Sequence, residues 1–351
     1  MFYFNELTDI QRKLFVDLRQ VYEAYRLSQS QSGHYAGSMR WREKNGTDYL
    51  FRKIGSVEKG LGVRSPQTET IYASFLDGRK KIKERLAGQT KALDVQAALA
   101  KASGLGRVPR IVAQILRKLD DTQILGHIRI VGTNALFAYE ALAAVTVAGD
   151  ALATGDIDLL IDARRRLRIM IPDKAERSVA GLVKRIDPSF EILPGNPYRM
   201  ANSNGFMLDL IRPQPNPAWK EEAGAQLGDG DLVPSPIEGL QWLVNAPRVD
   251  ALVVDVNGYP APIAAPDPRI WMVHKIWLST RPLRDPVKVQ RDVTQAHLMR
   301  DLLLEKLPQF PLDDAFFNTL PHPLRAASLS LLPPPPPLSD DDDDVFPTPK
   351  W

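Results

Sequence analysis

The sequence contains no cysteine and only five histidines among its 351 residues. It also has no uninterrupted apolar run near the ~20 residues that a bilayer-spanning helix needs. The lack of cysteine excludes disulfides, thiolate zinc sites and thiol catalysis. The histidines form no cluster with ligand spacing, so a zinc centre is not expected. The first ten residues have no basic segment followed by an apolar core, which argues against a secretory signal. We therefore expect a cytoplasmic protein without a membrane anchor.

Positive charge is concentrated in the first third of the chain. Residues 1–120 contain 22 Lys and Arg against 12 Asp and Glu, a net charge of +10, whereas the remaining residues carry −7. Such a region attracts polyanions, including RNA and the phosphates of a nucleotide. An ordinary solvated helical surface explains the same charge equally well.

The first third mixes helical and extended patterns. Apolar residues at spacings of three and four predict an amphipathic helix over residues 5–28. Two extended stretches flank Asn45-Gly46, which is typical of a tight hairpin turn. Ser65-Pro66 predicts a helix start, and helices are expected over residues 67–86 and 95–119, the second interrupted at Gly104-Leu105-Gly106.

From about residue 122 the pattern combines short strands with helices. Four runs rich in β-forming residues are expected to be strands: residues 126–131, 156–161, 190–193 and 206–211. A helix is predicted over 134–145, a hairpin that turns at Asn257-Gly258, and two later helices over 269–279 and 287–304.

These elements predict an α+β fold, in which a small mixed β-sheet is flanked by helices. We expect a mainly helical N-terminal region with a β-hairpin over residues 1–120 and a core over 121–265. A C-terminal helical region over 266–331 and a disordered Pro/Asp-rich tail over 332–351 complete the predicted organisation.

Asp156 and Asp158 are separated by one residue in a predicted strand. Alternate residues of a strand face the same side, so both carboxylates would enter one small volume. Their repulsion is costly unless a cation is shared, and Mg²⁺ prefers such oxygen ligands. Two acids at this spacing are by themselves more often a solvated pair at a sheet edge.

Two further features favour a phosphoryl-transfer site. Gly132-Thr133 follows a β-rich run and precedes a helix, where a glycine lets phosphate approach the backbone and the helix N-terminus supplies donors. Asp209 is a lone acid in the apolar run over residues 206–211, and a buried carboxylate needs a partner.

The order Gly-Thr, Asp-x-Asp and a later Asp resembles the polymerase β nucleotidyltransferase superfamily. Three stretches, residues 131–141, 153–164 and 267–279, more closely resemble a little-characterised bacterial branch of minimal nucleotidyltransferases. The resemblance covers roughly residues 120–310. One departure is the gap of 24 residues from Gly132 to Asp156, which is longer than usual in the superfamily and implies an extra loop around residues 146–154.

The resemblance implies an enzyme that transfers a nucleoside monophosphate from an NTP to a hydroxyl group, in the core over residues 121–265. Two Mg²⁺ ions are implied as cofactors, with Mn²⁺ as an alternative. Asp156 and Asp158 would bind both ions. Asp209 would bind the catalytic ion and could accept the proton of the attacking hydroxyl. Two-metal sites work by lowering that hydroxyl's pKa and by neutralising the leaving pyrophosphate.

The nucleotide itself is expected to contact Gly132, Thr133, Asn134 and Lys275. Lys275 is the candidate for the triphosphate, although it would equally suit the solvated side of an amphipathic helix.

Other charged residues near these segments have simpler interpretations. Lys288 and Asp292 are expected to form an ordinary i,i+4 pair, and the run Arg164–Arg166 is more often a solvated face. His274 is expected to be structural.

The acceptor is the least determined part of the prediction. The basic N-terminal region, with its aromatic residues Tyr35, Trp41, Tyr49 and Phe51, could bind a macromolecular acceptor such as tRNA or protein. The same aromatics could form the core of a small β-element. Two alternatives stay open: nucleotidylation of a small hydroxylated molecule, and a non-catalytic module that binds nucleotide or nucleic acid. The oligomeric state is not predicted.

Overall fold

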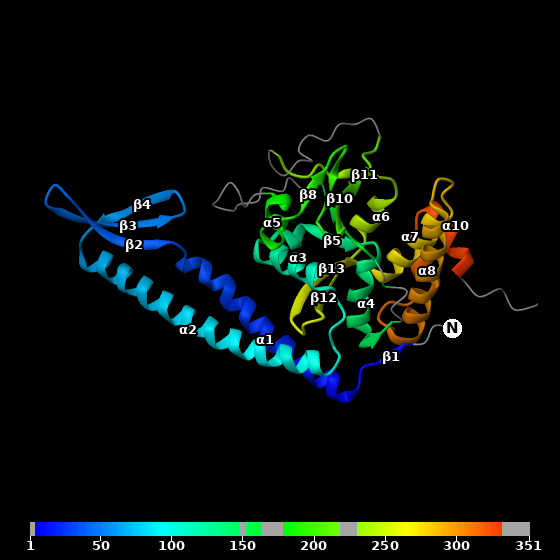
Figure 1. The fold of residues 1–351 in the computed structure, drawn as a ribbon, viewed down its shortest axis with the longest axis horizontal. Helices are drawn as coiled ribbons and strands as arrows, with labels where there is room; N and C mark the ends of the chain where they lie inside the picture. The colour runs from blue at the N-terminus through cyan, green and yellow to red at the C-terminus, as the bar shows by residue number, and fades with distance from the viewer. Residues whose placement is uncertain (1–3, 148–151, 153, 163–177, 218–229, 332–351) are drawn as a thin grey trace, which may run out of the picture.

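The computed structural model describes residues 4–147, 152, 154–162, 178–217 and 230–331. These residues form a long arm and a core of mixed sheet and helices (Figure 1). The run Arg164–Arg166, the tail after residue 331 and most of the expected loop around residues 146–154 lie outside the described part. No helix within the described ranges has the length and apolar character to span a bilayer.

Two antiparallel helices and a three-stranded sheet form the arm. Helix α1 (Asp9–Ser32) leads to strands β2 (Ser38–Lys44), β3 (Thr47–Ile54) and β4 (Val57–Val63), and α2 (Pro66–Ala102) returns to the core. The strands pair in the order β2-β3-β4 and lie at the tip of the arm, away from the core (Figure 1).

Local sequence signals explain where these elements begin and turn. Thr8 caps α1 and Ser65 caps α2, each in a capping box that satisfies free backbone donors at the helix start. Asn45 and Gly46 both have positive φ, as a tight hairpin turn requires.

Two expectations for the arm were wrong in detail. The helices expected over residues 67–86 and 95–119 are instead one helix, α2, that continues to Ala102, followed by α3 (Arg110–Asp121). Residues 103–109 are not helical and separate the two helices, and Gly104 within them has a positive φ. In addition, β4 makes the expected hairpin into a three-stranded sheet.

The core contains a six-stranded mixed sheet. Its strands are β5 (Ile128–Val131), β7 (Asp156–Ile161), β8 (Glu191–Leu193), β9 (Asn196–Ala201), β10 (Met207–Pro213) and β11 (Ser235–Ile237). They follow the order β5-β7-β10-β9-β8, and β11 pairs with the end of β10. Strands β7 and β10 are parallel, whereas β5 pairs antiparallel with β7 and β9 antiparallel with β10. The α+β class with a mixed sheet is confirmed.

Helices and two smaller strand pairs surround this sheet. The helices are α3, α4 (Leu136–Ala143), α5 (Val179–Ile186), α6 (Leu240–Asn245), α7 (Pro268–Ser279), α8 (Pro286–Lys306), α9 (Asp314–Asn318) and α10 (His322–Ser328). The strand pairs are β12 (Arg248–Val254) with β13 (Pro260–Pro266), and β1 (Asn5–Glu6) with β6 (Val145–Thr146). The predicted hairpin at Asn257-Gly258 is therefore present.

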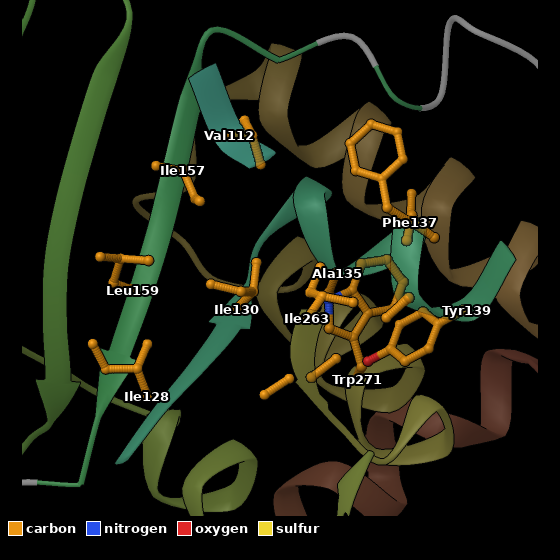
Figure 2. Packing of buried hydrophobic residues seen from close by; sticks show 14 of the residues in the cluster. Val112, Ile128, Ile130, Ala135, Phe137, Tyr139, Ile157, Leu159, Ile263 and Trp271 are labelled. Atoms are coloured by element: carbon orange, nitrogen blue, oxygen red, sulfur yellow. The ribbon is translucent and has the colours of Figure 1, made fainter. Parts of the chain in front are cut away.

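The two faces of the sheet have different environments. Ile157 and Leu159 of β7 point into the main hydrophobic core, together with Ile128 and Ile130 of β5 (Figure 2). The intervening residue Leu160 faces the other side, where it packs in a small cluster with α6. Because side chains alternate along a strand, Asp156 and Asp158 share the side of Leu160.

The arm is joined to the core where α2 ends. The turn between β12 and β13 packs so closely against α2 that a Cβ on Gly258 would lie 1.9 Å from the Ala97 carbonyl oxygen. Next to this contact, Arg117 of α3 donates to the buried Asp255 carboxylate at 2.9 Å. Helix α3 itself packs into the main core. Because α3 packs into the core, we propose that the arm ends before α3, and not after it as the expected boundary at residue 120 implied.

Gly258→Ala is expected to destabilise the protein by about 1–2 kcal/mol from its positive φ and by about 1–3 kcal/mol more from the clash with α2. Gly205 provides a matched control, because it also has a positive φ but nothing lies within 4 Å of its Cβ position. Gly205→Ala should show only the first cost. Urea unfolding of both variants measures the difference, and equal losses would contradict the described joint.

Candidate active site

The three aspartates predicted from the sequence lie on one face of the sheet. Asp158 of β7 is the register partner of Asp209 on the parallel neighbour β10, and Asp156 precedes Asp158 by two residues. Residues in register on adjacent strands point to the same side. All three line a cavity of about 270 Å³, which Gly132 and Lys275 also line. The structure thus brings together side chains that are up to 143 residues apart in the sequence.

Gly132 lies directly against one of these acids. It has a φ of 61°, and a Cβ at this position would be 2.0 Å from the Asp158 Oδ2 atom. Its carbonyl oxygen accepts a hydrogen bond of 3.1 Å from the Trp271 indole nitrogen on α7. Glycine is therefore required twice, for its conformation and for the space that the carboxylate occupies.

Thr133 and Asn134 have different positions. Thr133 lines the cavity, and Gln295 of α8 donates to its hydroxyl at 3.1 Å. Asn134 is buried and does not belong to the cavity lining; its Nδ2 donates to the Asp156 backbone oxygen at 2.6 Å. This bond ties the turn after β5 to the start of β7. In the structure, Asn134 positions Asp156.

Asp158 is under the strongest electrostatic strain of the three acids. Burial raises the pKa of its carboxyl, and the neighbouring charges of Asp156 and Asp209 raise it further, to about 6. The positive charges of Lys275 and Lys288 act in the opposite direction but do not compensate. A group in this situation is stabilised by any cation that enters the cavity.

Asp209 is held differently, by an arginine that the sequence patterns did not indicate. Arg199, its register partner on β9, donates from Nε and Nη2 to the two Asp209 oxygens, each at 2.6 Å. This fork geometry is the strongest form of ion pair between side chains. The pair raises the pKa of Arg199. The only signal in the sequence was an arginine on the strand before β10, which is too common to be informative.

Lys275 is buried, not on a solvated helix side. Its Nζ donates to Asp292 at 2.8 Å and lies 5.3 Å from the centre of the Trp271 ring. Burial lowers the pKa of Lys275, and Asp292 partly offsets that effect. Asp292 also accepts from Arg284 at 2.8 Å. The expected i,i+4 pair of Lys288 with Asp292 is wrong, because Asp292 is fully buried and its carboxylate faces α7 and Arg284.

The remaining cavity wall combines cations with apolar side chains. Lys288 and Arg291 of α8 line it opposite the acidic strands. An apolar wall is formed by residues from the sheet, α6 and α7, namely Val131, Ile211, Leu240, Leu243 and Leu278. His274 also lines the cavity, where burial lowers its pKa to about 3 and keeps the ring neutral. Its Nε2 is a buried atom without a hydrogen-bond partner among the described residues.

The described side chains in the cavity are of the type that binds a divalent cation, but their positions do not yet form a complete metal site. Carboxylates that repel one another in a buried cavity are suitable ligands for Mg²⁺. Within the described ranges, however, no three acidic or histidine side chains form a ready-made metal site. Both oxygens of the Asp209 carboxylate accept hydrogen bonds from Arg199, so a metal that binds Asp209 has to compete with this arginine.

The model of a nucleotidyltransferase family matches residues 110–320, which is more than half of the chain and includes all of these side chains. The chain belongs to this nucleotidyltransferase family. It therefore carries an enzyme domain that transfers nucleoside monophosphates. No curated protein and no solved structure matches the chain.

The two neighbouring acids of this nucleotidyltransferase should respond in opposite ways to loss of charge. The folded-state pKa of Asp158 is raised to about 6 from 3.8, so the metal-free protein loses stability as pH rises between those values. Asp158→Asn should therefore stabilise the metal-free protein at pH 7, by on the order of 2–3 kcal/mol. Asp209→Asn should destabilise it by about 2 kcal/mol, because Arg199 loses its ionic partner.

Chemical unfolding of both variants at pH 4 and pH 7, in the presence of EDTA, tests this contrast. At pH 4 the advantage of Asp158→Asn should shrink, since the wild-type carboxyl is then protonated in the folded protein. A destabilising effect of Asp158→Asn at pH 7 would show that its charge is already compensated.

Proposed function

We propose that this nucleotidyltransferase uses Mg²⁺ to transfer a nucleoside monophosphate from an NTP to a hydroxyl of a macromolecular acceptor, either tRNA or protein. The observation that carries the proposal is that Asp156, Asp158 and Asp209 lie on one sheet face and line the same cavity as Lys288 and Arg291. Acidic groups that hold cations, in one cavity with basic groups that hold phosphates, match the charge distribution of an NTP with its metal.

Asp156 and Asp158 would hold Mg²⁺ or Mn²⁺, joined by Asp209 once it leaves Arg199. When bound, the ions lower the pKa of the attacking hydroxyl and neutralise charge on the leaving pyrophosphate. The negative charges of the three aspartates agree with binding of divalent ions at this position. The excess negative charge around Asp158 is what two divalent ions would neutralise.

The protein's own groups would orient the reactants as follows. The acceptor oxygen attacks the α-phosphorus, the bond from that phosphorus to the bridging oxygen breaks, and pyrophosphate leaves. Asp209 receives the hydroxyl proton. Lys288 and Arg291 hold the departing phosphates, while Gly132 allows the nucleotide to approach the backbone beside Asp158. Lys275 fixes α7 to α8 through Asp292 and adds positive charge to the cavity wall.

The arm supports a large acceptor over a small one. With ~1.5 Å per residue, the 37 residues of α2 extend over about 55 Å. An arm of this length, with a sheet at its tip, adds a surface that a small hydroxylated molecule in the cavity could not contact (Figure 1).

Asp156→Asn should reduce nucleotide transfer by about 10³-fold or more, since a missing metal ligand commonly costs several kcal/mol of barrier. The measurement is transfer of label from α-³²P-labelled NTPs to RNA or protein in a cell extract, with pyrophosphate release in parallel. Glu238→Gln, an exposed change outside the cavity, serves as the control. Unchanged transfer in Asp156→Asn would end the proposal, and NTP binding without pyrophosphate release for any acceptor would favour a non-catalytic module.

Arg199→Ala tests the release of Asp209 without an activity assay. The metal-free variant should be less stable by about 3 kcal/mol, because a buried carboxylate loses its partner. Saturating MnCl₂ should raise its melting temperature more than that of the wild type, since no arginine competes for Asp209.

Arg284→Ala is the matched control for this experiment. It removes an arginine from a different buried aspartate, Asp292, which is not a proposed metal ligand. It should lower stability without enlarging the response to MnCl₂. Equal responses in Arg199→Ala and the wild type would show that Asp209 does not bind the metal.

A further inference from the structure

The sheet at the tip of the arm has one packed face and one open face. Met39 and Leu50 are buried on the packed face against Phe75 of α2, and Trp41 stacks edge-on with Tyr72 at 5.9 Å. The predicted group of aromatics is thereby divided. Tyr35 and Trp41 belong to the packed side, whereas Tyr49 and Phe51 alternate with its residues and lie on the other side.

We call this other side the open face and define it by six side chains: Arg40, Arg42, Lys44, Tyr49, Phe51 and Lys53. All four cations are exposed and the two rings are half-buried. Glu58, on the same side of β4, is shared by Arg40 and Arg42 at 2.9 and 3.0 Å. One carboxylate for four cations leaves a strongly basic surface.

The two rings stand next to one another on the central strand. Tyr49 and Phe51 are two residues apart, so they project about 7 Å from each other on the same side. Arg42 lies over the Phe51 ring at 5.0 Å, and Gly60 occupies the other neighbouring position. Because Gly60 has no side chain, the β4 position that pairs with Phe51 places no side-chain atoms beside the ring.

We infer that the open face binds unpaired bases of single-stranded RNA, with Tyr49 and Phe51 as stacking platforms and the four cations as phosphate contacts. Exposed sheet aromatics flanked by Arg and Lys bind successive bases in this way, because every base has a π-face. An apolar protein partner would not suit four exposed cations. RNA is the nucleic acid that commonly presents unpaired bases together with a free terminal hydroxyl.

Helix α2 carries further exposed cations. Arg79, Lys80 and Lys83 of α2 are exposed, between the tip and the core. They offer contacts to a backbone that extends from the tip. That the bound RNA is the acceptor of the transfer reaction rests on the proposed function, whereas RNA binding itself does not.

Fluorescence anisotropy of a labelled single-stranded RNA tests the inference with the full chain, without NTP or metal. Duplex RNA and single-stranded DNA of the same sequence are the comparison ligands. The wild type should bind the single-stranded RNA most tightly. Tyr49→Ala/Phe51→Ala should weaken this binding about tenfold or more. Phe51→Leu, which keeps apolar volume but has no ring, should also weaken it and guards against a folding defect.

Charge contributes separately and has its own control. Lys44→Ala/Lys53→Ala should weaken binding and reduce the slope of log K against log salt by about 1.4, for two phosphates on a single strand. Arg110→Ala/Arg325→Ala removes two exposed cations from helices of the core and should leave the affinity unchanged within about twofold.

Three results would overturn the inference: wild-type RNA affinity in both aromatic variants, tighter binding of the duplex, or equal binding of DNA. The transfer reaction is tested independently in the same preparation. Asp156→Asn should bind the RNA as the wild type does, so intact binding without transfer counts against the proposed function alone. Transfer to RNA that persists in Tyr49→Ala/Phe51→Ala with unchanged affinity counts against the open face alone.

Discussion

The alternation of side chains along two parallel strands is the constraint on which this site depends. Leu208 and Leu210 of β10 enter the main core, as Ile157 and Leu159 of β7 do, and this burial fixes both strands in register. A slip by one residue would turn every apolar side chain out of the core. The same register therefore forces the intervening acids onto the opposite face, so the hydrophobic core supplies the energy that holds like charges together.

The resting site balances those charges in two ways. Asp209 forms an ion pair with Arg199, and Asp292 forms ion pairs with Lys275 and Arg284. Asp158 has no such partner within the described ranges, and its pKa is raised by burial and by repulsion from Asp156 and Asp209. In the proposed function, a cation that enters the cavity would relieve this repulsion and compete with Arg199 for Asp209. Metal binding and rearrangement of Arg199 would then be coupled through charge.

Much of this arrangement could be predicted from the sequence, because its main parts follow local rules. The Asp-x-Asp pair, the apolar strand around Asp209 and the Gly-Thr turn predicted residues that the structure brings together, and Ser65-Pro66 predicted the start of α2. The partners of the acids could not be predicted. Arg199 and the burial of Lys275 depend on which strand and helix become neighbours, and that is decided by tertiary packing. The continuous α2 was missed for a related reason: Leu93, in the expected gap between residues 86 and 95, packs against Leu18 and Tyr22 of α1, and this tertiary contact overrides local propensity.

Anomalous diffraction from crystals soaked with Mn²⁺ and a non-hydrolysable NTP would show which side chains bind the metal. We expect Mn²⁺ bound by the carboxylates of Asp156 and Asp158, with Asp209 turned from Arg199 toward the metal. Manganese found elsewhere, or an Asp209 that keeps both bonds to Arg199 while Mn²⁺ and nucleotide are bound, would contradict it.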